Sequence, residues 1–211
     1  MKFCGLTRFE DAREAASLGA SFVGVVFAGG ARAVTAAQAR QLFDGVGATA
    51  RRVGVFGADA LQRAPQTVEE VSIDVMQLHG DPRAADVIRM RRSFGGHIWA
   101  VARLEGAGLP AWVDELFREA DAVLLDARVA GMLGGSGVAL PWGEVATALD
   151  GIRDRTPVVL AGGLTPENVA EAIRLVAPDV VDVSSGVESA PGIKDHGRMR
   201  AFMRAAKEHA E

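Results

Sequence analysis

The chain has 211 residues, of which 49% are hydrophobic, a formal net charge of −4 and one cysteine. This length can bury a large core as one domain or as two small ones, and the acidic balance provides no basic field for nucleic acid or an anionic membrane. One cysteine permits neither an internal disulfide nor a thiolate cluster for zinc. Cys4 is therefore either a small buried side chain or a reactive thiol.

The hydropathy of the chain gives no sign of a membrane segment. No apolar run approaches the roughly 18 residues that a membrane span needs, and the opening residues MKFCGLTR lack the apolar stretch of a secretory signal. We therefore expect a cytoplasmic protein that binds neither nucleic acid nor a membrane. We expect it to act as a monomer or a homodimer.

Strand patterns and helix patterns alternate along the chain. Eight runs rich in β-forming residues are FCGL (3–6), SFVGVVF (21–27), RRVGVF (51–56), DVMQLHG (74–80), HIWAVAR (97–103), DAVLLD (121–126), PVVLAGG (157–163) and DVVDVSSG (179–186). Thr7 with Glu10 and Thr35 with Gln38 have the spacing of capping boxes, and Asp81-Pro82 and Thr165-Pro166 pair a capping residue with a proline. The segment 195–210 carries apolar residues at helical spacing, which predicts a final helix.

This alternation predicts an α/β fold with parallel strands, because parallel neighbours need a crossover of a dozen or more residues. Eight strand-and-helix units indicate a closed (β/α)8 TIM barrel that occupies residues 1–211 as a single domain. A doubly wound open sheet is the alternative. The first strand is not followed by the GxGxxG pattern typical of many such sheets.

In a barrel of this kind the active site gathers at the carboxyl ends of the strands. Three glycine-rich stretches lie at or after the late strands, namely residues 134–137 (GGSG), 161–168 (AGGLTPEN) and 184–188 (SSGVE). Consecutive backbone N–H groups in such loops can converge on a phosphate. Taken singly, each stretch is better explained as a turn, but loops after strands 7 and 8 are the usual phosphate site of a barrel, which favours a phosphate role for the three together.

Several blocks, read in order, resemble one enzyme family. They are CGLTRFEDA (4–12), MQLHGD (76–81), LLDA (124–127), GGSG (134–137), LAGGLTPENV (160–169), VDVSSGVE (181–188) and PGIKD (191–195). Together they resemble the phosphoribosylanthranilate isomerase family of the ribulose-phosphate-binding barrel group. The resemblance implies an Amadori rearrangement of N-(5-phosphoribosyl)anthranilate, a small phosphorylated substrate, in tryptophan biosynthesis without a metal or a cofactor.

The implied chemistry needs an acid and a base. Asp126 closes an apolar strand, where desolvation keeps a carboxyl protonated, so it suits the acid; it could instead cap the next segment or pair with Arg128. Cys4 matches the family's base, since a thiol with a reference pKa of about 8.5 can ionise more readily near positive charge. The alternative for Cys4 is inert packing.

The remaining predicted site residues bind the substrate. Arg32 matches the family's arginine for the anthranilate carboxylate, although AGG and not the usual lysine, serine or proline stands before Ala31-Arg32. Asp182 either contacts a substrate hydroxyl or holds the turn after its strand, and His79 is given no catalytic role. Leu140-Pro141 replaces the family's aromatic and acid before Trp142. The predicted substrate-binding set is Arg32, Gly134, Gly135, Ser136, Gly137, Gly162, Gly163, Asp182, Ser185 and Gly186.

Two other functions fit parts of the pattern. The histidine-pathway aminoaldose isomerases perform the same rearrangement on a doubly phosphorylated substrate, but they carry an aspartate at the end of strand 1, where this chain has Cys4. A noncatalytic phosphosugar-binding barrel would keep the glycine loops and would need neither Cys4 nor Asp126.

The glycine loop at 134–137 gives the first testable prediction. Replacing Gly135 by aspartate fills the loop and repels an anionic ligand, so affinity for the phosphorylated product should drop sharply while the circular dichroism spectrum stays unchanged. Titration calorimetry with the product measures this. Unchanged product affinity in Gly135→Asp would remove the loop from the phosphate site.

Overall fold

The computed structural model describes residues 1–58, 61–106, 108–127, 140–152 and 156–208. Within these residues, eight parallel strands close into a barrel in the order β1 to β8, with β1 paired to both β2 and β8. The barrel strands are β1 (Lys2–Phe3), β2 (Phe22–Val26), β3 (Arg51–Phe56), β4 (Val75–Leu78), β5 (His97–Leu104), β6 (Ala122–Ala127), β7 (Val158–Leu160) and β8 (Val180–Val183). The predicted barrel is confirmed, and the open-sheet alternative is wrong because β1 and β8 are hydrogen-bonded neighbours.

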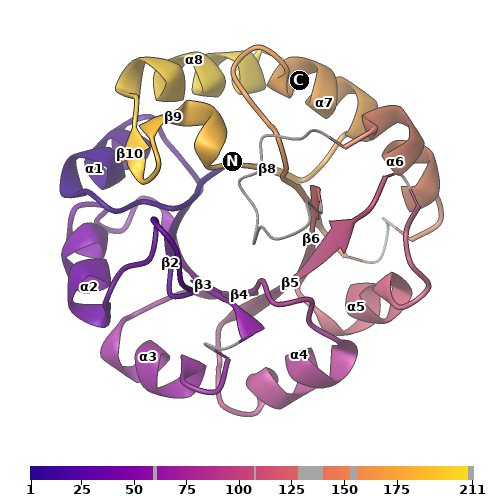
Figure 1. Cartoon of the computed structure of the whole chain (residues 1–211), viewed down its shortest axis with the longest axis horizontal. Coiled ribbons are helices and arrows are strands. Elements are labelled where there is room, and N and C mark those ends of the chain that lie inside the picture. The colour runs from indigo at the N-terminus through magenta and orange to yellow at the C-terminus, as the bar shows by residue number, and fades with distance from the viewer. Residues whose placement is uncertain (59–60, 107, 128–139, 153–155, 209–211) are drawn as a thin grey trace.

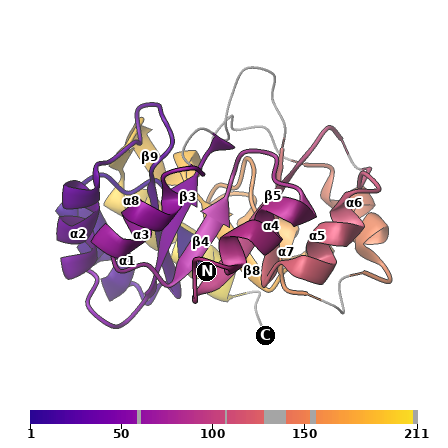
Figure 2. The same cartoon turned by 90° about the horizontal axis from the view of Figure 1, so that it is seen from below.

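Helices surround the barrel as an outer ring (Figure 1). They are α1 (Phe9–Ser17), α2 (Ala36–Asp44), α3 (Ala64–Glu70), α4 (Ala84–Arg91), α5 (Val113–Glu119), α6 (Trp142–Leu149), α7 (Val169–Val176) and α8 (His196–Lys207). A short helix, η3 (Ser185–Val187), and an antiparallel hairpin of β9 (Glu188–Ala190) and β10 (Ile193–Lys194) lie between β8 and α8. In Figure 2 the N-terminus lies toward the lower side of the barrel and β9 toward the upper side.

Two of the predicted helix boundaries are confirmed. Thr35 and Gln38 form the capping box of α2. The final helix is α8, whose N-terminus is capped by Asp195 and whose buried Phe202 packs against Phe3 of β1. The apolar face of α8 thereby covers the outside of the first strand.

The other three predicted starts are wrong, because Thr7 and Asp81 make tertiary contacts and Thr165 lies in a local turn. The Thr7 hydroxyl donates to the carbonyl of Gly192, and α1 begins only at Phe9. Asp81 pairs with Arg103, so α4 begins at Ala84. Thr165-Pro166 lies in a turn whose backbone is held by Asn168, and α7 begins at Val169.

The barrel has two apolar layers of packing. One large cluster fills the space between strands and helices, and a second fills the barrel interior, where alternate residues of each strand point inward. The interior cluster comprises Cys4, Val53, Val55, Val75, Trp99, Val101, Ala122, Leu124, Val159 and Ala161. No helix in the described part of the chain has the length and apolar character needed to cross a membrane.

Candidate active site

A cavity of about 320 Å³ opens at the carboxyl ends of the barrel strands. Cys4, Asp126, Asp182 and Arg32 all line it. So do four of the predicted loop residues, Gly162, Gly163, Ser185 and Gly186. The predicted residues Gly134, Gly135, Ser136 and Gly137 lie outside the described residues. The structure therefore brings together every predicted site residue that it describes.

Cys4 directly follows β1, and its side chain lies in the barrel interior with 8% of the residue exposed. Its backbone N–H donates to the carbonyl of Val183 at 2.9 Å, which fixes the thiol beside β8. The next residue, Gly5, has a φ of 70°, and a side chain there would lie 2.7 Å from Arg32 Cδ. Only glycine turns the chain here without displacing Arg32.

The electrostatics of Cys4 differ from the expectation of a lowered pKa. Burial raises the pKa of the thiol above its ordinary value, and the charge of Asp182 raises it further. The ammonium groups of Lys2 and Lys194 oppose this rise, with Lys2 the larger influence, but do not cancel it. Positive charge is present near Cys4 as expected, and desolvation outweighs it.

Asp126 ends the apolar run of β6 and is 4% exposed. Burial, followed by the negative charge of Asp182, raises its pKa to about 6. Gly162 lies close against it, since a side chain at that position would come within 2.8 Å of Asp126 Oδ1. A carboxyl that holds its proton close to neutral pH can act as a general acid. Arg128, its alternative partner, lies outside the described residues.

Asp182 on β8 joins the cavity to the barrel interior. Its Oδ2 accepts a hydrogen bond from the ammonium of Lys2 at 2.7 Å. Its Oδ1 is buried and has no hydrogen-bond partner among the described residues. Because a buried carboxylate oxygen without a partner is costly, Oδ1 is a ready acceptor for a ligand hydroxyl in the cavity.

Arg32 is held by an acidic residue that the sequence analysis did not select. Its Nε and Nη2 donate to the two carboxylate oxygens of Glu188 at 2.9 and 2.7 Å. Glu188 also accepts from the buried ammonium of Lys194 at 2.9 Å, and Lys194 donates to the carbonyl of Ser184. The bidentate contact fixes the plane of the guanidinium, and Nη1 makes no hydrogen bond within the described part of the chain.

The glycines at the ends of β7 and β8 are required by close packing. Gly162 and Gly163 have φ of 82° and 65°. A side chain at Gly186 would lie 1.8 Å from the carbonyl oxygen of Leu164, so the two loops touch through their backbones. The steric explanation of these glycines holds, and the same residues line the cavity, where they leave backbone close to any ligand.

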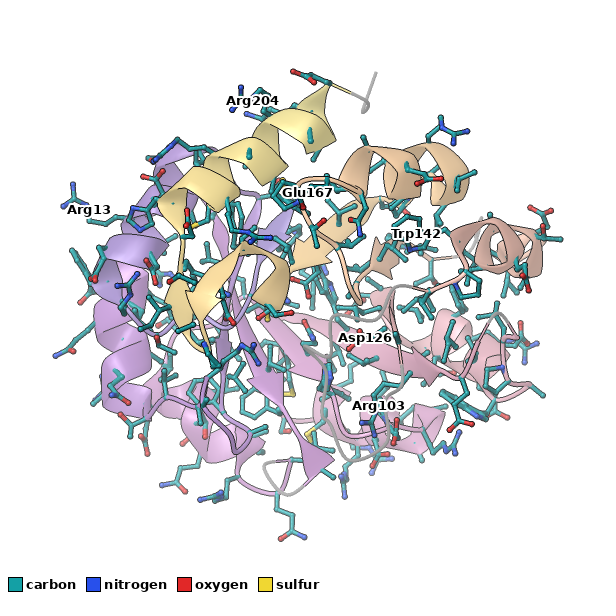
Figure 3. All side chains as sticks on the ribbon, turned by 45° about the horizontal axis from the view of Figure 1, so that its top comes forward. Arg13, Arg103, Asp126, Trp142, Glu167 and Arg204 are labelled. Atoms are coloured by element: carbon teal, nitrogen blue, oxygen red, sulfur yellow. The ribbon has the colours of Figure 1, made fainter. Side chains whose placement is uncertain are left out.

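His79, which follows β4, lies beside the candidate acid Asp126. Its Nε2 is 3.8 Å from Asp126 Oδ2, and its Nδ1 is 3.4 Å from the side-chain nitrogen of Gln77. An amide nitrogen can only donate, so Nδ1 accepts and the neutral ring carries its proton on the side that faces Asp126. Arg103 on β5 is the strand neighbour of Asp126, and Figure 3 shows the two side chains near each other.

Three charged residues around the site are not among the residues predicted from the sequence: Lys2, Glu188 and Lys194. The signal for Lys2 was present, because it precedes Cys4 by two residues and strand side chains alternate between the two faces. Glu188 and Lys194 come from the hairpin after β8, whose position no local pattern predicts. Among the described residues, no group of three or more His, Cys, Asp or Glu is arranged to hold a metal ion.

A buried thiol and a carboxyl of raised pKa that share one cavity, next to an arginine and glycine-lined loops, define a (β/α)8-barrel enzyme that works by acid–base chemistry. Comparison with known proteins narrows this class. The family model for N-(5'-phosphoribosyl)anthranilate isomerase matches residues 1–205. The chain belongs to this family.

Relatives and solved structures agree with the family match. The N-(5'-phosphoribosyl)anthranilate isomerases of Pseudomonas fluorescens (strain Pf0-1) and Nitrosococcus oceani are each 41% identical, covering 98% and 97% of this chain and 97% and 95% of theirs. The crystal structure of the Thermus thermophilus enzyme has a TM-score of 0.84 at 33% identity, with 98% of both chains covered. A structure of the enzyme in complex with reduced 1-(o-carboxyphenylamino)-1-deoxyribulose 5-phosphate has a TM-score of 0.81 at 30% identity, covering 98% of this chain and 97% of that one.

The raised pKa of Asp126 can be measured directly. Carboxyl-carbon NMR should show one aspartate that titrates with a midpoint of about 6. Because the charge of Asp182 contributes to that rise, the midpoint should move to lower pH in Asp182→Asn. The signal should vanish in Asp126→Asn. A midpoint that stays in place in Asp182→Asn would mean that the two carboxyl groups do not interact.

Proposed function

We propose that the chain carries out the Amadori rearrangement of its family with Asp126 as general acid and Cys4 as general base. The product is 1-(2-carboxyphenylamino)-1-deoxyribulose 5-phosphate. The observation that carries the two roles is the shared cavity: the thiol enters it from β1 and the carboxyl from β6, and burial raises the pKa of Asp126 to about 6.

The first step opens the sugar ring. Asp126 donates its proton to the furanose oxygen, the bond from that oxygen to C1′ breaks, and the electron pair of the anthranilate nitrogen forms a protonated Schiff base at C1′. Asp126 is left as a carboxylate. His79, which presents its Nε2 proton 3.8 Å away, is suitably placed to stabilise that charge.

The second step moves the proton from C2′. Ionised Cys4 removes it, and the released electron pair forms the C1′=C2′ double bond while the positive nitrogen becomes neutral. The resulting enol-amine then gains a proton at C1′ and loses the proton of its C2′ hydroxyl, which gives the ketose. No electrons are gained or lost overall, so the reaction needs no redox partner.

Other side chains hold the substrate in place. Arg32, with its plane fixed by Glu188, offers Nη1 to the anthranilate carboxylate. Asp182 Oδ1 accepts from a ribose hydroxyl. Gly162, Gly163, Ser185 and Gly186, with the loop at 134–137, hold the phosphate through backbone N–H groups, and the position of the first four on the cavity rim supports this.

We also infer a single domain over residues 1–211 that acts in the cytoplasm as a monomer or homodimer and binds no nucleic acid. The family match over residues 1–205 supports the single domain. The net charge of −4 opposes nucleic-acid binding. Homodimers are supported by a relative, since one solved structure contains monomers generated from the dimeric Thermotoga maritima enzyme.

Cys4→Ser tests the base. A hydroxyl nearly matches the thiol in shape but is not appreciably ionised at neutral pH, so kcat should fall by ~10²-fold or more while the product still binds. Turnover is followed by the loss of fluorescence of freshly made phosphoribosylanthranilate. A serine variant with nearly normal kcat and slightly lower stability would make Cys4 a packing residue. If the unaltered chain turned over only the histidine-pathway aminoaldose, or neither substrate, one of the other two functions would hold.

Asp126→Asn tests the acid. The amide keeps the shape but cannot deliver a proton, so kcat should fall by at least ~10²-fold. Stability at neutral pH should not fall, because the change removes a buried charge. The matched control is Asp121→Asn at the opposite end of β6, where the carboxylate accepts from the backbone of Ile98 outside the cavity; its kcat should be unchanged. A nearly active Asp126→Asn enzyme would assign the acid elsewhere.

A further inference from the structure

The barrel interior contains one buried cation directly below the candidate base. Lys2 has 0% exposure, and it lies two residues before Cys4, so both side chains enter the barrel from β1. The two converge on Gly24 of β2, since a side chain there would lie 3.1 Å from Lys2 Cε and 3.1 Å from Cys4 Sγ. Most of the surrounding side chains are apolar.

Lys2 does not line the cavity itself, but it reaches two residues that do. Its ammonium donates to Asp182 Oδ2 at 2.7 Å, and Asp182 lines the cavity with its buried Oδ1 left without a hydrogen-bond partner among the described residues. The same ammonium acts on the Cys4 thiol, where it is the largest influence that opposes the burial-driven rise of the pKa. One side chain thus connects the candidate base to the candidate hydroxyl acceptor.

Stability alone does not account for this lysine. Burying an ammonium costs several kcal/mol, and replacing a buried ion pair by apolar side chains of similar volume is often neutral or stabilising. The methionines and leucines that the chain uses elsewhere in its core would fill the position without this cost. The buried ammonium of Lys2 is therefore better explained by a role in the proposed reaction at the cavity than by stability.

The other cations of the cavity end are each bound to a carboxylate. Arg32 and Lys194 both contact Glu188, and Arg103 contacts Asp81. Around Cys4 the charged and titratable groups are Lys2 from β1, Asp182 from β8, Lys194 from β10 and Arg32 from the loop after β2, with Asp126 and His79 lining the same cavity. Lys2 pairs with Asp182, which itself lines the cavity, whereas the Glu188 carboxylate that holds Arg32 and Lys194 does not line it.

We propose that Lys2 is a positioning residue for the proposed reaction, whose fixed positive charge below Cys4 allows the thiol to ionise and holds Asp182 with one oxygen toward the substrate. This role rests on the proposed function of Cys4 as the base. Lys2 keeps its proton throughout the reaction. When the thiolate takes the C2′ proton, Cys4 becomes a neutral thiol. The Asp182 carboxylate then remains as the ion-pair partner of Lys2.

Because the sequence contains a single cysteine, the rate of cysteine alkylation by iodoacetamide measures the reactivity of Cys4 specifically. The rate of alkylation follows the thiolate fraction, so its pH profile reports the pKa of the thiol. In Lys2→Gln, which keeps a donor toward Asp182 without the charge, the profile should shift to higher pH by at least about one unit, equivalent to a tenfold lower thiolate fraction at neutral pH. The kcat should fall accordingly while product binding is retained.

Two controls separate this role from a structural one. Lys194→Gln removes the other buried ammonium near Cys4 and should shift the profile less, because Lys194 has the smaller influence on the thiol. Lys207→Gln on α8 should leave the profile unchanged. A lysine that served only stability would lower the melting temperature of Lys2→Gln without moving the alkylation profile, and that result would overturn the proposal.

If Lys2→Gln does not fold, a second pair of variants decides. Asp182→Asn removes the counter-charge and should move the alkylation profile to lower pH, since Asp182 raises the pKa of the thiol. In the double variant with Asp182→Asn and Lys2→Met, the alkylation profile should move back to higher pH, with an about tenfold lower thiolate fraction than in Asp182→Asn alone. An unchanged profile would overturn the proposal. A fully active Cys4→Ser enzyme would instead overturn the proposed function, while the alkylation shift would remain.

Discussion

The pairing of β1 with β8 is the contact on which the site depends. It closes the barrel in the register Lys2 to Asp182 and Phe3 to Val183. Because Cys4 N–H donates to the carbonyl of Val183, the first strand ends beside the last one, although the two are about 180 residues apart in the chain. The Cys4 thiol, the Lys2 ammonium and the Asp182 carboxylate therefore come together only when the whole barrel has formed.

The hairpin after β8 extends this arrangement to the rim. Strand β9 carries Glu188 and strand β10 carries Lys194. The Glu188 carboxylate bridges Lys194 and Arg32. Lys194 also binds the carbonyl of Ser184, so the loop that follows β8 and the arginine that follows β2 share one anchor. The Glu188 carboxylate thus holds two cations, and these contacts fix the loops at the rim of the cavity.

Strand periodicity and strand ends were sufficient to predict the barrel, its alternation and the cavity positions of Cys4, Asp126 and Asp182. These features follow from local patterns, because the carboxyl ends of all parallel strands lie at the same end of a barrel, where the active site forms. The helix starts at Thr7, Asp81 and Thr165 were mispredicted because each of these residues is engaged by a distant contact or a turn. Glu188 could not be predicted, because its partner Arg32 lies 156 residues away. The alternation of strand side chains places Lys2 on the same face as Cys4, but no local pattern records its pair with Asp182, 180 residues away.

The environment of Cys4 has a consequence for the lifetime of the protein. Peroxide and other oxidants attack the thiolate, and oxidation beyond the sulfenic acid is largely irreversible. Burial raises the pKa of this thiol in the substrate-free site, so the resting protein exposes little of the vulnerable form. A chain with one cysteine has no second thiol to form a rescuing internal disulfide. The desolvation that raises the pKa of the Cys4 thiol therefore also protects it from oxidation in the substrate-free protein.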